Sequence, residues 1–304
     1  RRAVRHDRAS AHRAAAAVSV DRPFTLGAVA YAPKVVTIWE GFRDWFAAHD
    51  FAFDYVLYSN YETQVDALLR GDIDAAWNSP LAWVRARRVA EATGRRAVAT
   101  IMRDTDQDLT SVVLVRTDSG IDDVAQLAGR VVGVGAIDSP QSRLIPLGHL
   151  GAAGLAPGSF TVRRFDVMVG KHGDHVGGER DAVVALTKGE VDAACIIGAN
   201  QLAFAQEGAF APGSLRVLAE TAPYDHCVFT VVDGAVDAAR LARFDELLLS
   251  MSFEDPDVRG LLELEGLREW RPGRTSGFAQ LESAVDVLGL YGTDGALADP
   301  EYRP

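Results

Sequence analysis

The sequence has few of the residues that stabilise very small or membrane-spanning proteins. Only two cysteines, Cys195 and Cys227, occur in 304 residues, so the chain has no disulfide framework, although a single bridge between them stays open. No run of 18 apolar residues is present, and we expect no membrane-spanning helix. The composition, 48% hydrophobic and 24% charged, is that of a globular protein, and the length suggests about two domains.

Basic residues are in the minority as well. The chain has 42 acidic and 31 basic residues, and six of the arginines lie within the first 22 positions. The rest of the chain is therefore strongly acidic. Since phosphate backbones are bound by basic faces, we expect no nucleic-acid partner.

Residues 1–23 are predicted to form a disordered leader. They are rich in Arg and Ala but contain no hydrophobic segment of the length of an export signal. A remnant of such a signal and an upstream mistranslation are the alternatives. The location stays open: periplasmic, or membrane-anchored and extracellular, if an export signal was removed, and cytoplasmic otherwise.

From residue 24 onward, short apolar runs alternate with amphipathic stretches. The run FTLGAVAY (24–31) predicts a strand, and the next stretch (37–50) has aromatic residues at helical spacing. Alternating strands and helices are typical of α/β folds with mainly parallel sheets flanked by helices. The strings LLRGDIDAAW (68–77) and LTKGEVDAAC (186–195) share one pattern, which suggests two lobes built alike.

Four segments carry a resemblance to a known family. They are GAVAYAPK (27–34), YETQVDALLRGDIDAAWNSPLAWVRA (61–86), VVGVGAIDSPQSRLIPLGHLGAAGL (131–155) and ERDAVVALTKGEVDAACI (179–196). In order and local pattern, the chain resembles the substrate-binding proteins of phosphate/phosphite/phosphonate ABC importers, which have the type II periplasmic-binding-protein fold. The resemblance implies a ligand cleft between two lobes. We expect lobe one at 24–103 plus 231–290, lobe two at 108–222, and a tail at 291–304.

The best candidate for an anion site is the segment from Asp138 to Ser142. Pro140 in a first helical turn after Ser139 predicts a helix start, where free N–H groups and the helix dipole attract oxyanions. The resemblance assigns oxyanion binding to Ser139 and Ser142. Gln141 stands where the family has a small residue, and Asp138 would repel an anion. An ordinary capped helix is the alternative.

Further ligand-binding candidates follow the first strands or precede the last ones. The resemblance places Tyr31, Asn78, Ser79 and Trp83 at the cleft, and core packing is the alternative for the aromatic rings. Tyr224 lies at the return crossing between the lobes. Lys34 or Lys171 would balance an anionic ligand, whereas Cys195 is expected in the core.

The least family-like segment is GKHGDHVGGERDAV (170–183). It adds His175 to the expected His172, and its glycines suggest a mobile loop over the ligand. With His226 and Cys227, these residues would suit a transition metal or acid–base catalysis. A third interpretation is that these histidines are solvated or form hydrogen bonds to the ligand.

Two functions follow from these patterns. In the first, which we favour, the chain clamps a small anionic ligand, such as a phosphonate or phosphate ester, without a cofactor, and delivers it to an ABC permease if it is exported. In the second, it is a cytosolic enzyme on the same scaffold, as thiamine-pyrimidine synthases and menaquinone-pathway dehydratases are. This enzyme would act on a small phosphorylated or carboxylated metabolite and use iron or zinc, with His172, His175, His226 and Cys227 as catalytic or metal-binding residues.

Overall fold

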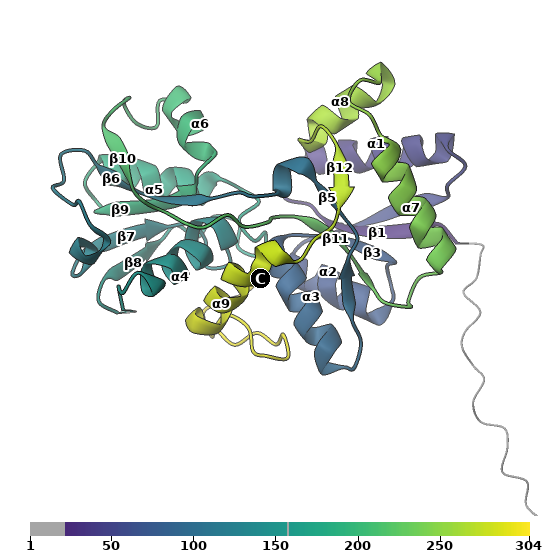
Figure 1. Ribbon diagram of the computed structural model, residues 1–304, viewed down its shortest axis with the longest axis horizontal. Coiled ribbons are helices and arrows are strands. Elements are labelled where there is room, and N and C mark those ends of the chain that lie inside the picture. Colours follow the sequence, from purple (N-terminus) through teal and green to yellow (C-terminus); the bar gives the residue numbers. More distant parts are fainter. Residues whose placement is uncertain (1–21, 157) are drawn as a thin grey trace, which may run out of the picture.

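The chain folds into two α/β lobes, each built on a five-stranded sheet (Figure 1). The computed structural model describes residues 22–156 and 158–304. Nearly all of the leader predicted over residues 1–23 lies outside these described residues. The two-lobed α/β architecture expected from the sequence is confirmed.

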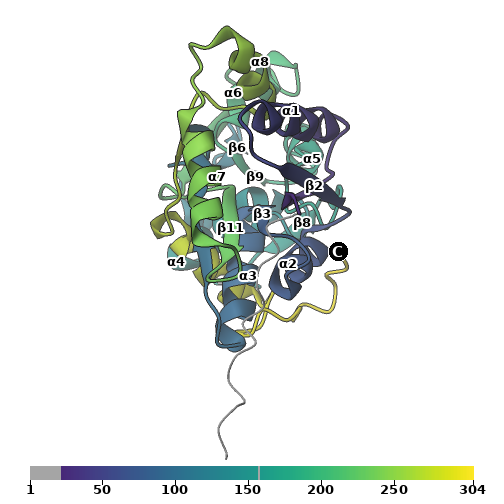
Figure 2. The same ribbon diagram turned by 90° about the vertical axis from the view of Figure 1, so that its right-hand side faces the viewer.

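The sheet of the first lobe has the strand order β2-β1-β3-β11-β4. Helices α1, α7 and α8 cover one face, on a core rich in aromatic rings, while α2 and α3 cover the other face (Figure 2). The elements are β1 (Phe24–Val29), α1 (Lys34–Ala48), β2 (Phe53–Tyr58), α2 (Tyr61–Arg70), β3 (Ala75–Asn78), α3 (Pro80–Ala92), β4 (Ala97–Ala99), β11 (Val228–Val232), α7 (Ala238–Ser250) and α8 (Pro256–Glu265).

The sheet of the second lobe has the strand order β10-β6-β9-β7-β8. Its elements are β6 (Ser111–Arg116), a 3₁₀ turn (Val124–Leu127), β7 (Val131–Val134), a wide π-type turn (Pro140–Leu144), α4 (Ile145–Ala152), β8 (Thr161–Arg164), α5 (Gly177–Thr187), β9 (Ala193–Ile197), α6 (Asn200–Gln206) and β10 (Leu215–Glu220). The repeated Gly-acid-aliphatic-Asp-Ala-Ala pattern lies in equivalent places, since it leads into β3 in one lobe and β9 in the other.

The sheets are mixed, with one strand in each that runs against the others. In each sheet four strands run in one direction, and the strand that arrives from the other lobe runs against them. Strand β11 is antiparallel to β3 and β4, and β6 is antiparallel to β9 and β10. Such a strand enters its sheet from the hinge side, so its direction is opposite to that of the strands started within the lobe. Between the lobes, the two crossing segments are joined by a bridge between Leu109 and Tyr224.

A small antiparallel pair stands beside the hinge. It consists of β5 (Ile101–Arg103) and β12 (Trp270–Pro272). A 3₁₀ turn, Asp104–Asp106, follows β5 and begins the first crossing. The pair holds the start of this crossing against the segment that follows α8.

The carboxyl-terminal segment joins the two lobes. Helix α9 (Ala279–Leu288) contacts α4 of the second lobe and α3 of the first. A single hydrophobic core includes Trp83 from the first lobe, Leu144 from the second, Tyr224 from the hinge and Tyr302 from the tail. The tail expected at 291–304 therefore packs into the interlobe core through Tyr291 and Tyr302.

Local sequence explains where the helices around the site begin and end. Asn60 accepts a hydrogen bond from the Thr63 N–H and caps α2, which ends at Gly71 with a left-handed φ of 80°. Ser79 caps α3 in the same way, with Pro80 in the first turn. Both helices therefore start at the carboxyl end of a strand, where Glu62 in the first turn of α2 and the cap residue Ser79 of α3 contact His172 of the second lobe.

The segment predicted as a mobile loop is partly helical. Gly177 and Gly178 lie in the first turn of α5, which contradicts the loop interpretation for these two residues. A Cβ at position 178 would stand 2.5 Å from the carbonyl oxygen of Phe165. Gly178 is therefore present because backbone approaches backbone here, and not because the chain needs to move.

We predict that Gly178→Ala destabilises the protein by about 2 kcal/mol, the typical cost of overpacking a rigid contact. Gly151→Ala is the matched control, because a Cβ there meets nothing within 4 Å in helix α4. The control should be neutral or slightly stabilising, since Ala favours helix over Gly. Urea denaturation of both variants measures the difference, and an equal stability of the two would contradict this account.

Candidate functional site

The predicted helix start at residues 138–142 lies between the lobes but is not open to solvent. Asp138, Ser139 and Ser142 are each at most 1% exposed. Ser139 accepts from the Ser142 N–H, as the capping prediction required, and the two hydroxyl oxygens lie 2.7 Å apart. We expected an exposed helix tip. Residues 170–173 of the same lobe cover it instead.

Asp138 attaches the covering segment to the helix start. Its Oδ2 accepts from the N–H groups of Gly170 (2.6 Å) and His172 (3.0 Å). Burial raises the pKa of Asp138, and these two hydrogen bonds oppose that shift. The carboxylate that the sequence suggested would repel an anion is thus engaged by backbone donors. Gln141 adds a third link, from Nε2 to the Gly173 carbonyl oxygen.

The covering segment has an unusual backbone. Met168 and His172 have φ values of 55° and 50°, and Gly170 and Gly173 also have positive φ. Left-handed geometry costs about 1–3 kcal/mol at a residue with a side chain, so it persists only where surrounding contacts enforce it. The fold of this segment therefore depends on the contacts that its side chains make.

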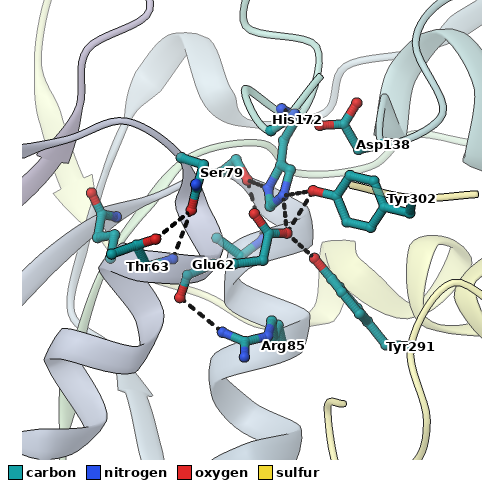
Figure 3. A network of polar contacts seen from close by, with 12 residues as sticks. Glu62, Thr63, Ser79, Arg85, Asp138, His172, Tyr291 and Tyr302 are labelled. Atoms are coloured by element: carbon teal, nitrogen blue, oxygen red, sulfur yellow. Dashed lines mark hydrogen bonds and ion pairs between the residues drawn. The ribbon is translucent and has the colours of Figure 1, made fainter. Parts of the chain in front are cut away.

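His172 supplies the central contact between the lobes (Figure 3). Its Nδ1 lies 2.7 Å from Ser79 Oγ, and its Nε2 lies 2.9 Å from Glu62 Oε1. Because an ionised carboxylate only accepts, Nε2 is the nitrogen that donates to Glu62. The ring also stacks on Tyr61, with 4.7 Å between centroids. His172, from lobe two, is completely buried against lobe one.

Glu62 collects donors from three parts of the chain. The Tyr291 and Tyr302 hydroxyls each donate to its Oε1 over 2.6 Å, beside the bond from His172. Burial acts to raise the pKa of Glu62, but the adjacent His172 and the three hydrogen bonds outweigh it and lower the pKa to about 2. We call Glu62, His172, Tyr291 and Tyr302 the interlobe clasp.

Two further contacts close the lobes beside the clasp. The Tyr61 hydroxyl donates to Asp174, and the Lys171 ammonium donates to the carbonyl oxygen of Ser59. Burial raises the pKa of the Asp174 carboxyl. Lys171, a predicted counter-ion for the ligand, is thus occupied by a backbone carbonyl, and Lys34, the other candidate, is exposed at the start of α1.

Next to Tyr61, a cavity of about 10 Å³ lies at the carboxyl ends of β1 and β3. Tyr31, Tyr61, Trp77 and Glu265 contribute to its wall. Burial raises the pKa of Tyr31 above its usual value and that of Glu265 to about 7, although Arg103 opposes the shift at Glu265. The cavity has an apolar wall and one weakly compensated carboxyl group.

A second buried cluster lies at the hinge. Asp106, His226 and Cys227 each offer one donor atom, and these atoms all lie within 4.8 Å of one another. Arg103 holds the Asp106 carboxylate through two hydrogen bonds of 2.6 and 2.9 Å. Burial acts to raise the pKa of Asp106, but Arg103 outweighs it and lowers the pKa to about 2.

The structure brings only some of the predicted site residues together. Ser139, Gln141, Ser142, His172 and Ser79 meet at the interlobe contact, while Tyr31 lies at the small cavity. Asn78 is buried and accepts from Gln64, Trp83 packs on Phe278 in the core, and Tyr224 shares a hydrogen bond with Ser111.

The predicted set of three histidines and a thiol does not form one centre. His226 and Cys227 are neighbours, but His172 is bound within the clasp and His175 is exposed beside the start of α5. Both cysteines are free thiols, and Cys195 lies in the core as expected. Four residues of these two clusters were not predicted from the sequence: Glu62, Asp106, Tyr291 and Tyr302. Only Glu62 carried a signal, as an acidic residue in the first turn of a helix that follows a strand.

Type II periplasmic binding proteins have two lobes that are linked by two crossing segments and meet over buried polar side chains. The chain is a substrate-binding protein of this class. More narrowly, it belongs to the family described as the phosphonate-type periplasmic substrate-binding protein of ABC transporters, whose model matches residues 27–277. It therefore acts as a solute-binding component, and the family indicates a location outside the cytoplasm.

Solved structures agree on the fold. PhnD1 from Prochlorococcus marinus (MIT 9301), in complex with methylphosphonate, has a TM-score of 0.64 at 16% identity, over 88% of this chain and 98% of that one. A binding-protein component of a phosphonate ABC transporter from Pseudomonas aeruginosa has a TM-score of 0.58 at 14% identity, over 90% of this chain and 91% of that one. The periplasmic aliphatic sulphonate binding protein SsuA from Escherichia coli has a TM-score of 0.54 at 18% identity, over 88% and 92%.

We predict that Glu62→Gln destabilises the protein by about 3 kcal/mol near pH 7, because it removes one partner of a buried charge-assisted network. The folded-state pKa of Glu62 is about 2, against an ordinary 4.5. Its stabilising contribution is thus complete above about pH 4.5 and is lost as the pH falls toward 2. The difference in unfolding free energy between variant and wild type should shrink over that range.

Urea denaturation at stepped pH checks this prediction. Glu91→Gln is the control, since Glu91 is 55% exposed and pairs only with Arg87 within α3. It should change stability by less than about 0.5 kcal/mol at every pH. If the difference in unfolding free energy between Glu62→Gln and the wild type stayed constant down to pH 3, an ionised Glu62 in the clasp would be ruled out.

Proposed function

We propose that the chain binds a small phosphonate or phosphate ester between its lobes, with the oxyanion at the helix start formed by Ser139 and Ser142. The observation that carries this proposal is the position of two adjacent serine hydroxyls at the start of a helix that runs on through α4, directly at the interlobe contact. Helix N–H groups and the dipole favour an anion at such a position.

A continuous chain of contacts connects this helix start with the aromatic cavity. Gln141 contacts Gly173, the next residue Asp174 bonds to Tyr61, and Tyr61 lines the cavity with Tyr31. An oxyanion at the serines would therefore have its organic substituent directed toward aromatic side chains. This pairing of a polar and an apolar end suits an organophosphonate or a phosphate ester.

Access to the serines requires residues 168–174 to move. The positive φ values at Met168 and His172 make this segment costly to hold in place. In our proposal the segment lifts when the lobes separate and closes on the bound ligand. A ligand that contacts both lobes stabilises only the closed form. The closed form therefore indicates to the partner permease that a ligand is bound.

The permease is the partner that the family implies. Among the described residues, no helix has both the length and the hydrophobicity to cross a bilayer, so translocation would fall to that partner. After removal of an export signal, the chain would work in the periplasm or, if membrane-anchored, on the outer face of the cell. The catalytic alternative gains no support, because its histidines are dispersed.

We predict that the double variant Ser139→Ala/Ser142→Ala lowers affinity for the preferred ligand at least about 100-fold, since two hydrogen bonds to an ionised group are lost. Isothermal titration calorimetry with methylphosphonate, phosphate, a phosphate monoester and an alkyl sulfonate measures which ligand is preferred and how much affinity the double variant loses. Loss of the Ser139 cap should also cost about 1 kcal/mol of stability.

Asp237→Ala separates these two effects. Asp237 caps α7 on the outer face of the first lobe by accepting from the Arg240 N–H. Its removal should cost a similar amount of stability and leave affinity unchanged. Unaltered affinity in the double serine variant would show that the oxyanion binds elsewhere.

A further inference from the structure

The hinge cluster of Asp106, His226 and Cys227 plays no part in the function described so far. All three side chains are buried, at 2%, 9% and 4% exposure. His226 Nδ1 lies 3.1 Å from Cys227 Sγ and 3.5 Å from Asp106 Oδ1. A sulfur, an imidazole nitrogen and a carboxylate oxygen thus face one another at distances that a single ion could span.

We propose that this cluster is a zinc site. Zinc prefers sulfur and nitrogen donors, accepts carboxylate oxygen, and lies about 2.0–2.3 Å from each of them in tetrahedral geometry. Two donors bound at such lengths are about 3–4 Å apart, close to the separations of Nδ1 from the other two atoms. A hard ion such as magnesium or calcium would take oxygen donors only.

The backbone holds the three donors in place before any ion arrives. Asp106 ends the first crossing's 3₁₀ turn, while His226 and Cys227 lie on the return crossing just before β11. The two segments are hydrogen-bonded through His226 N–H and the Asp106 carbonyl oxygen, over 2.8 Å. Little conformational entropy would therefore be lost on binding.

Arg103 is compatible with this site. It donates to both oxygens of Asp106, but each carboxylate oxygen can accept more than one bond, so Oδ1 keeps a lone pair for the ion. A donor behind a metal-binding carboxylate fixes its orientation, as outer-shell partners commonly do. Glu265, within 3.3 Å of Arg103, brings a further negative charge to the surroundings.

Zinc binding is balanced in charge and protons. The Cys227 thiol gives its proton to solvent and coordinates as thiolate, so Cys227, Asp106 and Glu265 supply three negative charges against the two of the ion and the one of Arg103. Three protein ligands leave a fourth position for water. Because the ion would bind one residue of the first crossing and two of the second, it would tie the hinge segments together. This inference does not depend on which oxyanion the lobes hold.

The test is metal binding to the purified full chain. Zinc titration against a competing chelator should give one tight equivalent, and cobalt loading should produce a thiolate-to-cobalt charge-transfer band. Cys227→Ser and His226→Asn should each weaken zinc binding by about 100-fold or more, because even outer-shell changes cost 10–100-fold. Cys227→Ser should also abolish the band.

Matched controls come from the same chain. Cys195→Ser removes the other buried thiol, and His175→Ala removes an exposed imidazole; both should bind zinc as the wild type does. Thermal unfolding with and without zinc shows that each variant is folded, and zinc should raise the midpoint only where the cluster is intact. Zinc binding of equal strength in Cys227→Ser and wild type, tighter binding of ferrous iron than of zinc, or no stoichiometric binding would overturn the proposal.

Discussion

The ionised Glu62 carboxylate, buried where the lobes meet, is the constraint on which the described conformation depends. A buried charge is tolerated only when it is paired and hydrogen-bonded. Its donors come from lobe two, through His172, and from the carboxyl-terminal segment, through Tyr291 and Tyr302. The hydrogen bonds that one buried carboxylate in α2 requires therefore fix the positions of both lobe two and the carboxyl-terminal segment.

The same contact determines how the candidate anion site is covered. The segment that carries His172 to Glu62 has left-handed backbone angles at Met168, Gly170, His172 and Gly173. Asp138 holds this backbone by accepting from two of its N–H groups. The helix start at Ser139 is thus linked to the first lobe through a short series of hydrogen bonds. A ligand that displaces any member of the series changes the relation between the lobes, which is what a clamp requires.

The sequence was most informative where structure is local. The helix start at Ser139 and Pro140 follows from side-chain chemistry within four residues, and it was predicted at its observed place. The caps at Asn60 and Ser79 and the helix end at Gly71 depend on equally local chemistry. The family resemblance added the two-lobed fold. Strand direction in β6 and β11 was not predictable in this way, because it depends on which lobe a strand comes from.

The site was predicted less completely, for a physical reason. Ser79 and His172 were named as ligand residues, yet they bond to each other across 93 positions. Asp106 and Cys227 meet only because two crossings run side by side, and nothing around Asp106 in the sequence marks it as a partner of His226. Hydrogen bonds between distant segments leave no periodicity or spacing that a single sequence would reveal.

The bond from Tyr302 to Glu62 spans 240 positions, and this separation has a consequence for biosynthesis. Helix α2 and the first strands emerge from the ribosome before Tyr302 does, so Glu62 cannot acquire its full set of donors until the carboxyl-terminal segment has been made. In a nascent chain, the Glu62 carboxyl would thus lack its hydrogen-bond donors or be protonated, and the lobes would be free to separate. Final docking of the two lobes can therefore occur only after Tyr302 has been synthesised.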